Sequence, residues 1–194
     1  MSKVDEKVEE TFEELNEVRR DPEGYLDKVK IYKGYFDDDN VLRIPGVLHG
    51  IKTEEGPAAY DEAAEYLKKA TPVCELTPSK GLFAIASDIL KIVQNEDPDN
   101  LDDIDMDAIV EKYGNYERDF HRSIQYGGTS GEHTIMDLFV GDGDKSRSQR
   151  EGLLNDNLRK VGIACGTHDR YRFVNIIVAC TKFNNKSGND NYTI

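Results

Sequence analysis

The chain has 194 residues, of which 38 are acidic and 25 are basic, so its formal net charge is −13. A chain of this length is most simply one domain with its own hydrophobic core, and this charge argues against a nucleic-acid partner held through its phosphates. The N-terminal sequence lacks the basic start and apolar run of an export signal, and no stretch approaches the roughly 18 apolar residues of a membrane span, so we expect a cytoplasmic protein that is not secreted.

Three cysteines, Cys74, Cys165 and Cys180, are scattered along the chain. Their odd number and wide spacing do not resemble a disulfide framework. We therefore expect all three to be buried free thiols in a reducing compartment.

The N-terminal third of the sequence is typical of helices. Apolar residues recur at spacings of three and four over residues 4–18, which predicts an amphipathic helix. Asp21 followed by Pro22 predicts the start of a second helix, and Pro57 begins a third segment that is rich in helix formers. Residues 36–56 have turn residues and acids without a sustained period, and we expect a long ordered loop there.

The middle of the chain predicts a central helix followed by an acidic loop. Thr77 as N-cap and Pro78 at the first helical position introduce an almost wholly apolar run, which we expect to form a buried central helix. Seven carboxylates lie within residues 96–107 and must be solvated. A short helix is predicted to start at Asp105.

The C-terminal third is rich in strands. Alternating apolar residues predict a strand over residues 119–127, and a helix follows over 132–141. Residues 160–183 contain two β-rich runs around a turn, and residues 184–194 form a polar tail. Because helices come mostly first and antiparallel strands last, the pattern favours the α+β class.

The stretch DLFVGDGDKSRSQREGLLNDNLRKVGIACG, residues 137–166, resembles the signature of the CAP superfamily. That superfamily contains cysteine-rich secretory proteins, antigen-5 proteins and pathogenesis-related type 1 proteins, and its pattern is approximately S-x-G-H-R-x-N-I-L followed by V-G-[IV]-[AG]. The matching residues are Ser146, Arg150, Leu153, Leu154, Val161, Gly162 and Ile163.

The segments LNEVRRDPEGYLDKV, LTPSKGLFAIASDIL and RSIQYG are also similar to protist members. The resemblance implies one CAP-like domain over residues 1–183, a three-layer α–β–α sandwich with a mainly antiparallel sheet.

The resemblance also implies a cleft, which in many members holds a divalent metal through histidines and glutamates. In this chain the ligand positions of that cleft fall on Ile89 (or its neighbour Asp88), Arg122 and Gln149. Isoleucine, arginine and glutamine do not form a zinc site together, and Arg122 repels a cation. We therefore expect no metal, no cofactor and no catalytic activity.

A weaker alternative site consists of His121, Glu132 and His133, which flank the glycine turn near this cleft. A displaced metal or acid–base site is one interpretation of these residues. The other interpretation, which we favour, is that they are strand-surface and helix-cap residues, because no H-x-x-x-H or H-x-x-E spacing links them.

The sequence thus predicts a non-catalytic intracellular CAP-like module for binding or scaffolding. Its expected partners are proteins of a larger cytoplasmic assembly, with the ciliary axoneme and its cytoskeleton as one setting. Two alternatives stay open. One is a lipid or sterol carrier, whose apolar groove the 36–56 loop would partly line, and the other is a hydrolase with a rearranged site.

Overall fold

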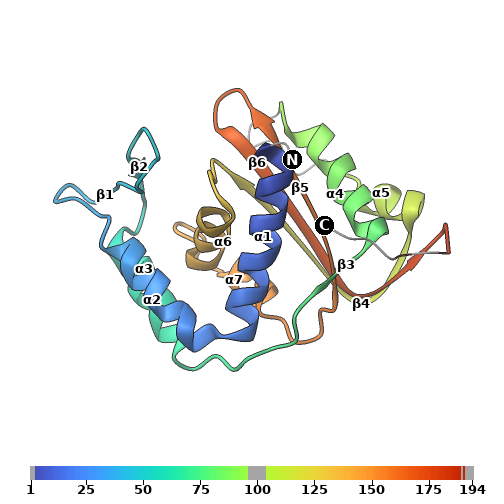
Figure 1. Cartoon of the computed structure of the whole chain (residues 1–194), viewed down its shortest axis with the longest axis horizontal. Coiled ribbons are helices and arrows are strands. Elements are labelled where there is room, and N and C mark those ends of the chain that lie inside the picture. Colours follow the sequence, from blue (N-terminus) through green and yellow to red (C-terminus); the bar gives the residue numbers. More distant parts are fainter. Residues whose placement is uncertain (1–2, 96–103, 189, 191–194) are drawn as a thin grey trace.

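The computed structural model describes residues 3–95, 104–188 and 190, and within these ranges it has seven helices and two sheets (Figure 1). The helices are α1 (Lys3–Arg20), α2 (Pro22–Lys33), α3 (Pro57–Leu67), α4 (Lys80–Val93), α5 (Met106–Tyr113), α6 (Gly131–Val140) and α7 (Ser148–Leu153). The strands are β1 (Val41–Leu42), β2 (Ile51–Lys52), β3 (Thr77–Pro78), β4 (Gly114–Tyr126), β5 (Lys160–His168) and β6 (Arg172–Asn185). No helix in the described ranges is long and apolar enough to cross a bilayer.

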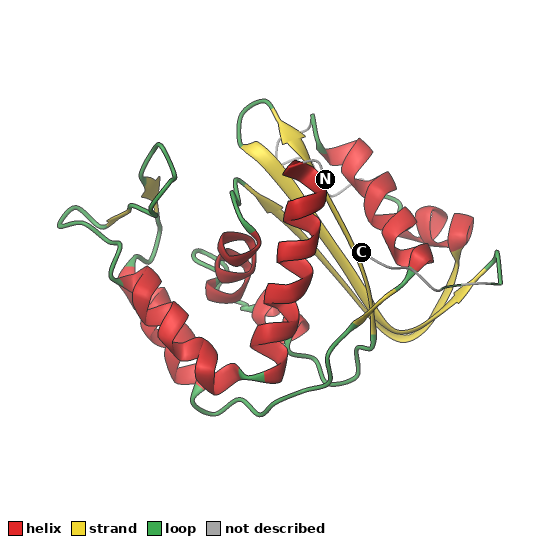
Figure 2. Ribbon diagram, viewed as in Figure 1, coloured by secondary structure: helices red, strands yellow, loops and turns green. Residues whose placement is uncertain are grey.

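The larger sheet has the strand order β3-β5-β6-β4 (Figure 2). Strand β6 pairs antiparallel with both β4 and β5, whereas the two residues of β3 pair parallel with β5. The mixed α and β composition and the mainly antiparallel sheet that the sequence predicts are therefore confirmed.

Two hydrophobic cores lie on opposite faces of this sheet. Along β5, Ile163 packs into the core beneath α1, α6 and α7, whereas Ala164 packs into the core beneath α4 and α5. Successive side chains of a strand point to opposite faces, so this alternation assigns each helix group to one face. Figure 1 shows α1 and α4 on either side of β5.

Side chains cap the starts of α2 and α4, and one of the two predicted caps is wrong. Asp21 caps α2, because its Oδ1 accepts a hydrogen bond of 2.9 Å from the N–H of Gly24. The predicted cap of the central helix at Thr77 is wrong. Thr77 and Pro78 form β3, and Ser79 caps α4 by accepting a bond of 3.3 Å from the N–H of Leu82. The N–H of Thr77 donates to the carbonyl of Arg159, directly before β5, instead of opening a helix.

The expected loops are partly structured. Residues 36–56 contain the small antiparallel pair of β1 and β2. Of the acidic segment, residues 96–103 lie outside the described residues. Asp105 caps α5, because its Oδ1 accepts a hydrogen bond of 3.0 Å from the N–H of Ala108. At the C-terminal end, β6 extends to Asn185 and so includes the first two residues of the predicted tail.

The three cysteines are free thiols, as expected, but their burial differs. Cys165 and Cys180 are buried in strands, and burial raises the pKa of both thiols, to about 11 for Cys165 and about 12 for Cys180. Cys74 is exposed, which corrects the prediction that all three are buried. It lies in the extended segment between α3 and β3, where no apolar pattern could indicate which side faces solvent.

Candidate functional site

Two of the three cleft positions lie on the face of the sheet that α4 covers. Ile89 of α4 is fully buried in the core on that face, as its apolar helix predicts. Arg122 lies on β4, two residues from Phe120 and two from Ile124, so the three side chains share one face of the strand. Phe120 and Ile124 pack against the core that contains Ile89. Ile89 and Arg122 therefore belong to one side of the molecule.

Gln149 lies on the opposite side. It is a residue of α7, and its Oε1 accepts a hydrogen bond of 2.6 Å from the hydroxyl of Ser123. Ser123 is the neighbour of Arg122 on β4, so its side chain points to the other face of the sheet. The structure thus does not bring Ile89, Arg122 and Gln149 together around one point.

A polar chain of three side chains instead joins β4 to α7. His121 Nε2 lies 2.8 Å from Ser123 Oγ, and Ser123 Oγ lies 2.6 Å from Gln149 Oε1. His121 and Ser123 are two residues apart on one strand, so both side chains reach the same face. We refer to His121, Ser123 and Gln149 as the polar chain.

The direction of the protons in the polar chain follows from its acceptors. The amide oxygen of Gln149 only accepts, so the single hydroxyl proton of Ser123 is donated to it. The oxygen of Ser123 then accepts from His121, whose proton is assigned to Nε2 by this bonding. A catalytic serine needs the reverse arrangement, in which the hydroxyl donates to the imidazole.

The surroundings of the polar chain also oppose catalysis. Burial lowers the pKa of His121 to about 4, so the ring is neutral near pH 7. Within the described residues no carboxylate contacts that ring. Ser123 is 1% exposed. The ring packs against Gly152 of α7, where a Cβ atom would stand 2.0 Å from the His121 Cε1 atom. Ser123 is therefore shielded from solvent on this face.

The weaker alternative set does not assemble. His133 is a buried residue of α6 whose Nδ1 accepts a bond of 3.3 Å from the N–H of Thr129, and burial lowers its pKa to about 4. Glu132 faces Lys28 at 3.8 Å. Among the residues that the structure describes, no group of three or more histidines, cysteines and acids has the arrangement of a metal site.

The motif arginine has a structural position. Arg150 is 2% exposed, and its guanidinium donates to the carbonyls of Phe139 and Val140 at 2.7 and 2.9 Å and to Glu62 at 2.9 Å. The two carbonyls belong to the last turn of α6, whose C-terminal carbonyls have no partner within the helix. A cation there also opposes the negative end of the helix dipole.

The remaining motif residues pack the same region. Leu153, Leu154, Val161 and Ile163 are buried in the core beneath α1. Ser146 is exposed and accepts a bond of 3.2 Å from the N–H of Ser148 at the start of α7.

Gly162 lies in close contact with α4. A Cβ atom at this position would stand 2.1 Å from the carbonyl carbon of Leu82 in α4. Glycine therefore lets α4 approach the sheet.

The hollow next to the 36–56 loop is mostly polar. Its volume is about 420 Å³, and it is lined by Tyr32, Tyr35, Ser130, Glu132 and Arg172 together with Ile44 of the loop. An apolar ligand would leave these polar groups without water, which opposes binding.

Ser123 is the member of the polar chain that the sequence interpretation missed. The spacing of two residues from His121 predicts that both share a face of β4, and this was the available signal. That α7 would cover this face with Gln149 depends on contacts between distant parts of the chain.

Comparison of the chain with models of protein families, with curated proteins and with solved structures finds no match.

Proposed function

We propose that this chain has the three-layer CAP arrangement and acts as a non-catalytic module that binds proteins within a larger assembly. The observation that carries the proposal is the polar chain. The hydroxyl of Ser123 donates to the amide oxygen of Gln149 at 2.6 Å and accepts from the neutral ring of His121, and Ser123 is 1% exposed. The polar groups nearest the motif are therefore used in internal bonding.

The motif residues support the same proposal. Arg150 satisfies the end of α6, and Gly162 permits the contact of α4 with the sheet. These residues build the fold without presenting a chemical group to solvent. A fold retained without reactive groups is suited to binding, because binding needs a shaped surface but no aligned nucleophile.

The two alternatives have less support. A hydrolase needs an accessible nucleophile, and Ser123 is buried. A carrier of lipid or sterol needs an apolar cavity, and the hollow beside the 36–56 loop contains Glu132 and Arg172.

The test is affinity purification of the full chain from its native cells, followed by sizing of the purified material. We expect protein partners at stoichiometric ratio. A panel of ester and peptide substrates should show no turnover above that of the Ser123→Ala variant. A chain that purifies alone as a monomer, or a hydrolytic rate that Ser123→Ala abolishes, would contradict the proposal.

A further inference from the structure

The start of α4 leaves four backbone N–H groups without a partner inside the helix, as every helix does. The N–H of Ser79 donates to a carbonyl of β5 at 2.9 Å, and the N–H of Leu82 donates to the Ser79 hydroxyl at 3.3 Å. The other two both donate to Asp190. Lys80 donates to its main-chain carbonyl at 3.3 Å, and Gly81 donates to its carboxylate Oδ1 at 3.1 Å. A residue 109 positions from Gly81 thus completes the start of this helix.

The carboxylate of Asp190 also reaches the side chain that caps the helix. Its Oδ1 accepts a hydrogen bond of 2.6 Å from the hydroxyl of Ser79, which is 0% exposed. A negative charge is favourable here because the N-terminal end of a helix dipole is positive. The second oxygen, Oδ2, is buried as well and has no hydrogen-bond partner within the described residues. The carboxylate is therefore enclosed at the start of α4 instead of being displayed to water.

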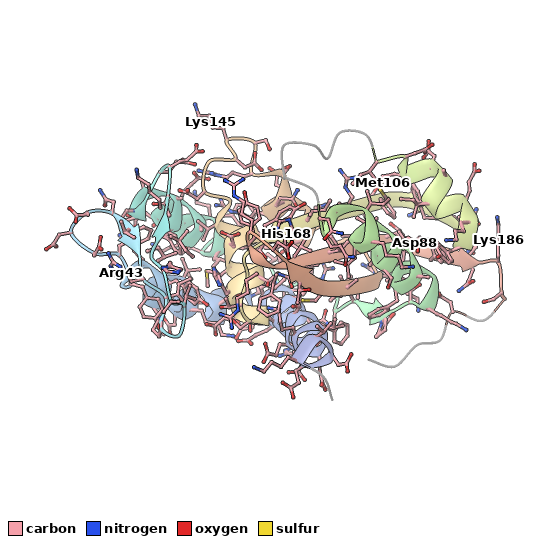
Figure 3. The ribbon with its side chains drawn as sticks, turned by 90° about the horizontal axis from the view of Figure 1, so that it is seen from above. Arg43, Asp88, Met106, Lys145, His168 and Lys186 are labelled. Carbon is pink, nitrogen blue, oxygen red and sulfur yellow. The ribbon has the colours of Figure 1, made fainter. Side chains whose placement is uncertain are left out.

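The chain turns back after β6 and so brings Asp190 to this place. The N–H of Gly188, whose φ of +76° suits glycine, donates to the carbonyl of Asn185 at 3.0 Å. The N–H of Lys186 donates at 2.8 Å to the carbonyl of the last residue of α5. Figure 3 labels Lys186 just beyond the end of β6. We refer to residues 186–188 and 190 as the strap, which is tied to α5 at one point and to α4 at another.

Cys180 lies in the core at the same end of α4. It is 0% exposed and belongs to the cluster that contains Leu82 and Phe183. The start of α4 packs directly against that cluster, since a Cβ atom at Gly81 would stand 2.0 Å from the Phe183 ring. Burial raises the pKa of the Cys180 thiol, and the negative charge of Asp190 raises it further. The carboxylate therefore lies close enough to Cys180 to oppose formation of its thiolate.

We infer that the strap is a closing device for this end of the core: Asp190 fastens it to the start of α4, and its release makes the thiol of Cys180 reactive. Without the Asp190 contacts, two N–H groups lose their partners, and the first turn of α4 opens more often because unpaired buried donors destabilise the closed state. The charge that opposes thiolate formation leaves at the same time. This inference goes beyond the proposed function, since it concerns the chain's own strap and does not depend on a partner.

Amide hydrogen exchange of the full chain, followed by NMR, tests the fastening. In Asp190→Ala the Gly81 amide loses its acceptor, and its exchange should become about tenfold faster or more. Asp190→Asn keeps an acceptor oxygen and should give a smaller change. The matched control is Asp169→Ala, the same substitution at an exposed position of the β5–β6 turn, which should leave the Gly81 rate unchanged. An unaltered Gly81 rate in Asp190→Ala would overturn the inference.

The three cysteines of the chain provide the second measurement, which is the rate of alkylation by iodoacetamide under native conditions, resolved by mass spectrometry. Cys180 should react about tenfold faster in Asp190→Ala than in the unaltered chain. Cys165, which is buried in β5, should keep its rate, and the exposed Cys74 should react quickly in every variant. Two results contradict the closing role: an unchanged rate at Cys180, or an equal acceleration at Cys165, which would mean that the substitution loosens the whole fold.

Discussion

Gly162 of β5 lies against the backbone of Leu82 in α4, with space for a hydrogen atom but not for a carbon, since a Cβ atom would stand 2.1 Å from the Leu82 carbonyl carbon. Gly162→Ala must therefore displace the helix, because the contact is with backbone and cannot be relieved by a rotamer. We expect a loss of at least about 2 kcal/mol of unfolding free energy in urea titration.

Gly166→Ala is the matched control on the same face of the same strand. Its Cβ atom would approach the end of the Leu90 side chain at 3.0 Å, and a side chain can move aside. We expect a loss below about 1 kcal/mol. Equal losses at the two positions would show that the close approach of α4 at Gly162 is not what selects glycine.

Ile89 occupies a fully buried position of α4, so removing its side chain leaves a cavity. Ile89→Ala should lower the unfolding free energy by about 2–5 kcal/mol. Ile92→Ala, at a position 45% exposed on the same helix, should cost less than about 1 kcal/mol. A loss below about 1 kcal/mol at Ile89 would mean that this residue faces an open cleft.

The positions of Ile89, Arg122 and Gln149 show what one sequence can and cannot predict. The apolar run around Ile89 predicts its burial, because the pattern along a helix reports its own solvent exposure. Whether three distant residues converge depends on which face of the sheet each one occupies. Arg122 and its neighbour Ser123 point to opposite faces, and only the register of β4 against β6 decides which of them meets α7.

Caps illustrate the same limit at shorter range. Asp21 and Ser79 are both good N-caps, and the sequence identified the first. For α4 the sequence predicts a cap two residues too early, since Thr77-Pro78 is equally typical of a helix start. The N–H of Thr77 donates to the carbonyl of Arg159, which is 82 positions away in the chain, so a local sequence pattern cannot predict this bond.

Zinc should not bind at the cleft positions. Ile89 offers no donor atom, Arg122 is a cation on the same face, and Gln149 uses its oxygen for Ser123 on the other face. Calorimetry with Zn²⁺ should give no saturable site of micromolar affinity. The Cys74→Ser variant serves as the sample, because Cys74 is exposed and a thiolate binds zinc weakly by itself. A single saturable site in that variant would refute this prediction.

Two histidines, the buried His133 and the half-buried His121, should make the fold sensitive to mild acid. Burial lowers the pKa of His121 and of His133 from the ordinary histidine value of 6.5 to about 4. The unfolded chain therefore takes up protons between these values while the folded chain does not. Stability from this source is fully present above about pH 6.5 and is lost as the pH falls toward 4, by roughly 3 kcal/mol at most for each histidine.

Urea titrations at pH 7 and pH 5 measure this loss. His121→Gln and His133→Gln should each reduce the difference between the two pH values, whereas His49→Gln, at an exposed position, should leave it unchanged. NMR titration of the imidazole signals should give values near 4 for both rings. Midpoints near 6.5 would show that the rings are hydrated in solution.

Arg150 provides the sharpest test of the motif as a structural feature. Its planar guanidinium reaches Phe139 and Val140 carbonyls and the Glu62 carboxylate from one buried position, and the single ammonium of lysine cannot make all three bonds. Arg150→Lys leaves buried carbonyls at the end of α6 unpaired, and we expect a loss of about 2–4 kcal/mol in urea titration.

Arg20→Lys is the control, because Arg20 makes an ion pair with Glu75 in which both side chains are at least half exposed. The exchange should change the unfolding free energy by less than about 0.5 kcal/mol. If Arg150→Lys is equally mild but releases the partners found by copurification, Arg150 serves recognition and not the end of α6. The motif would then mark a binding surface, and the resemblance to the CAP signature would reflect a shared partner chemistry instead of a shared fold.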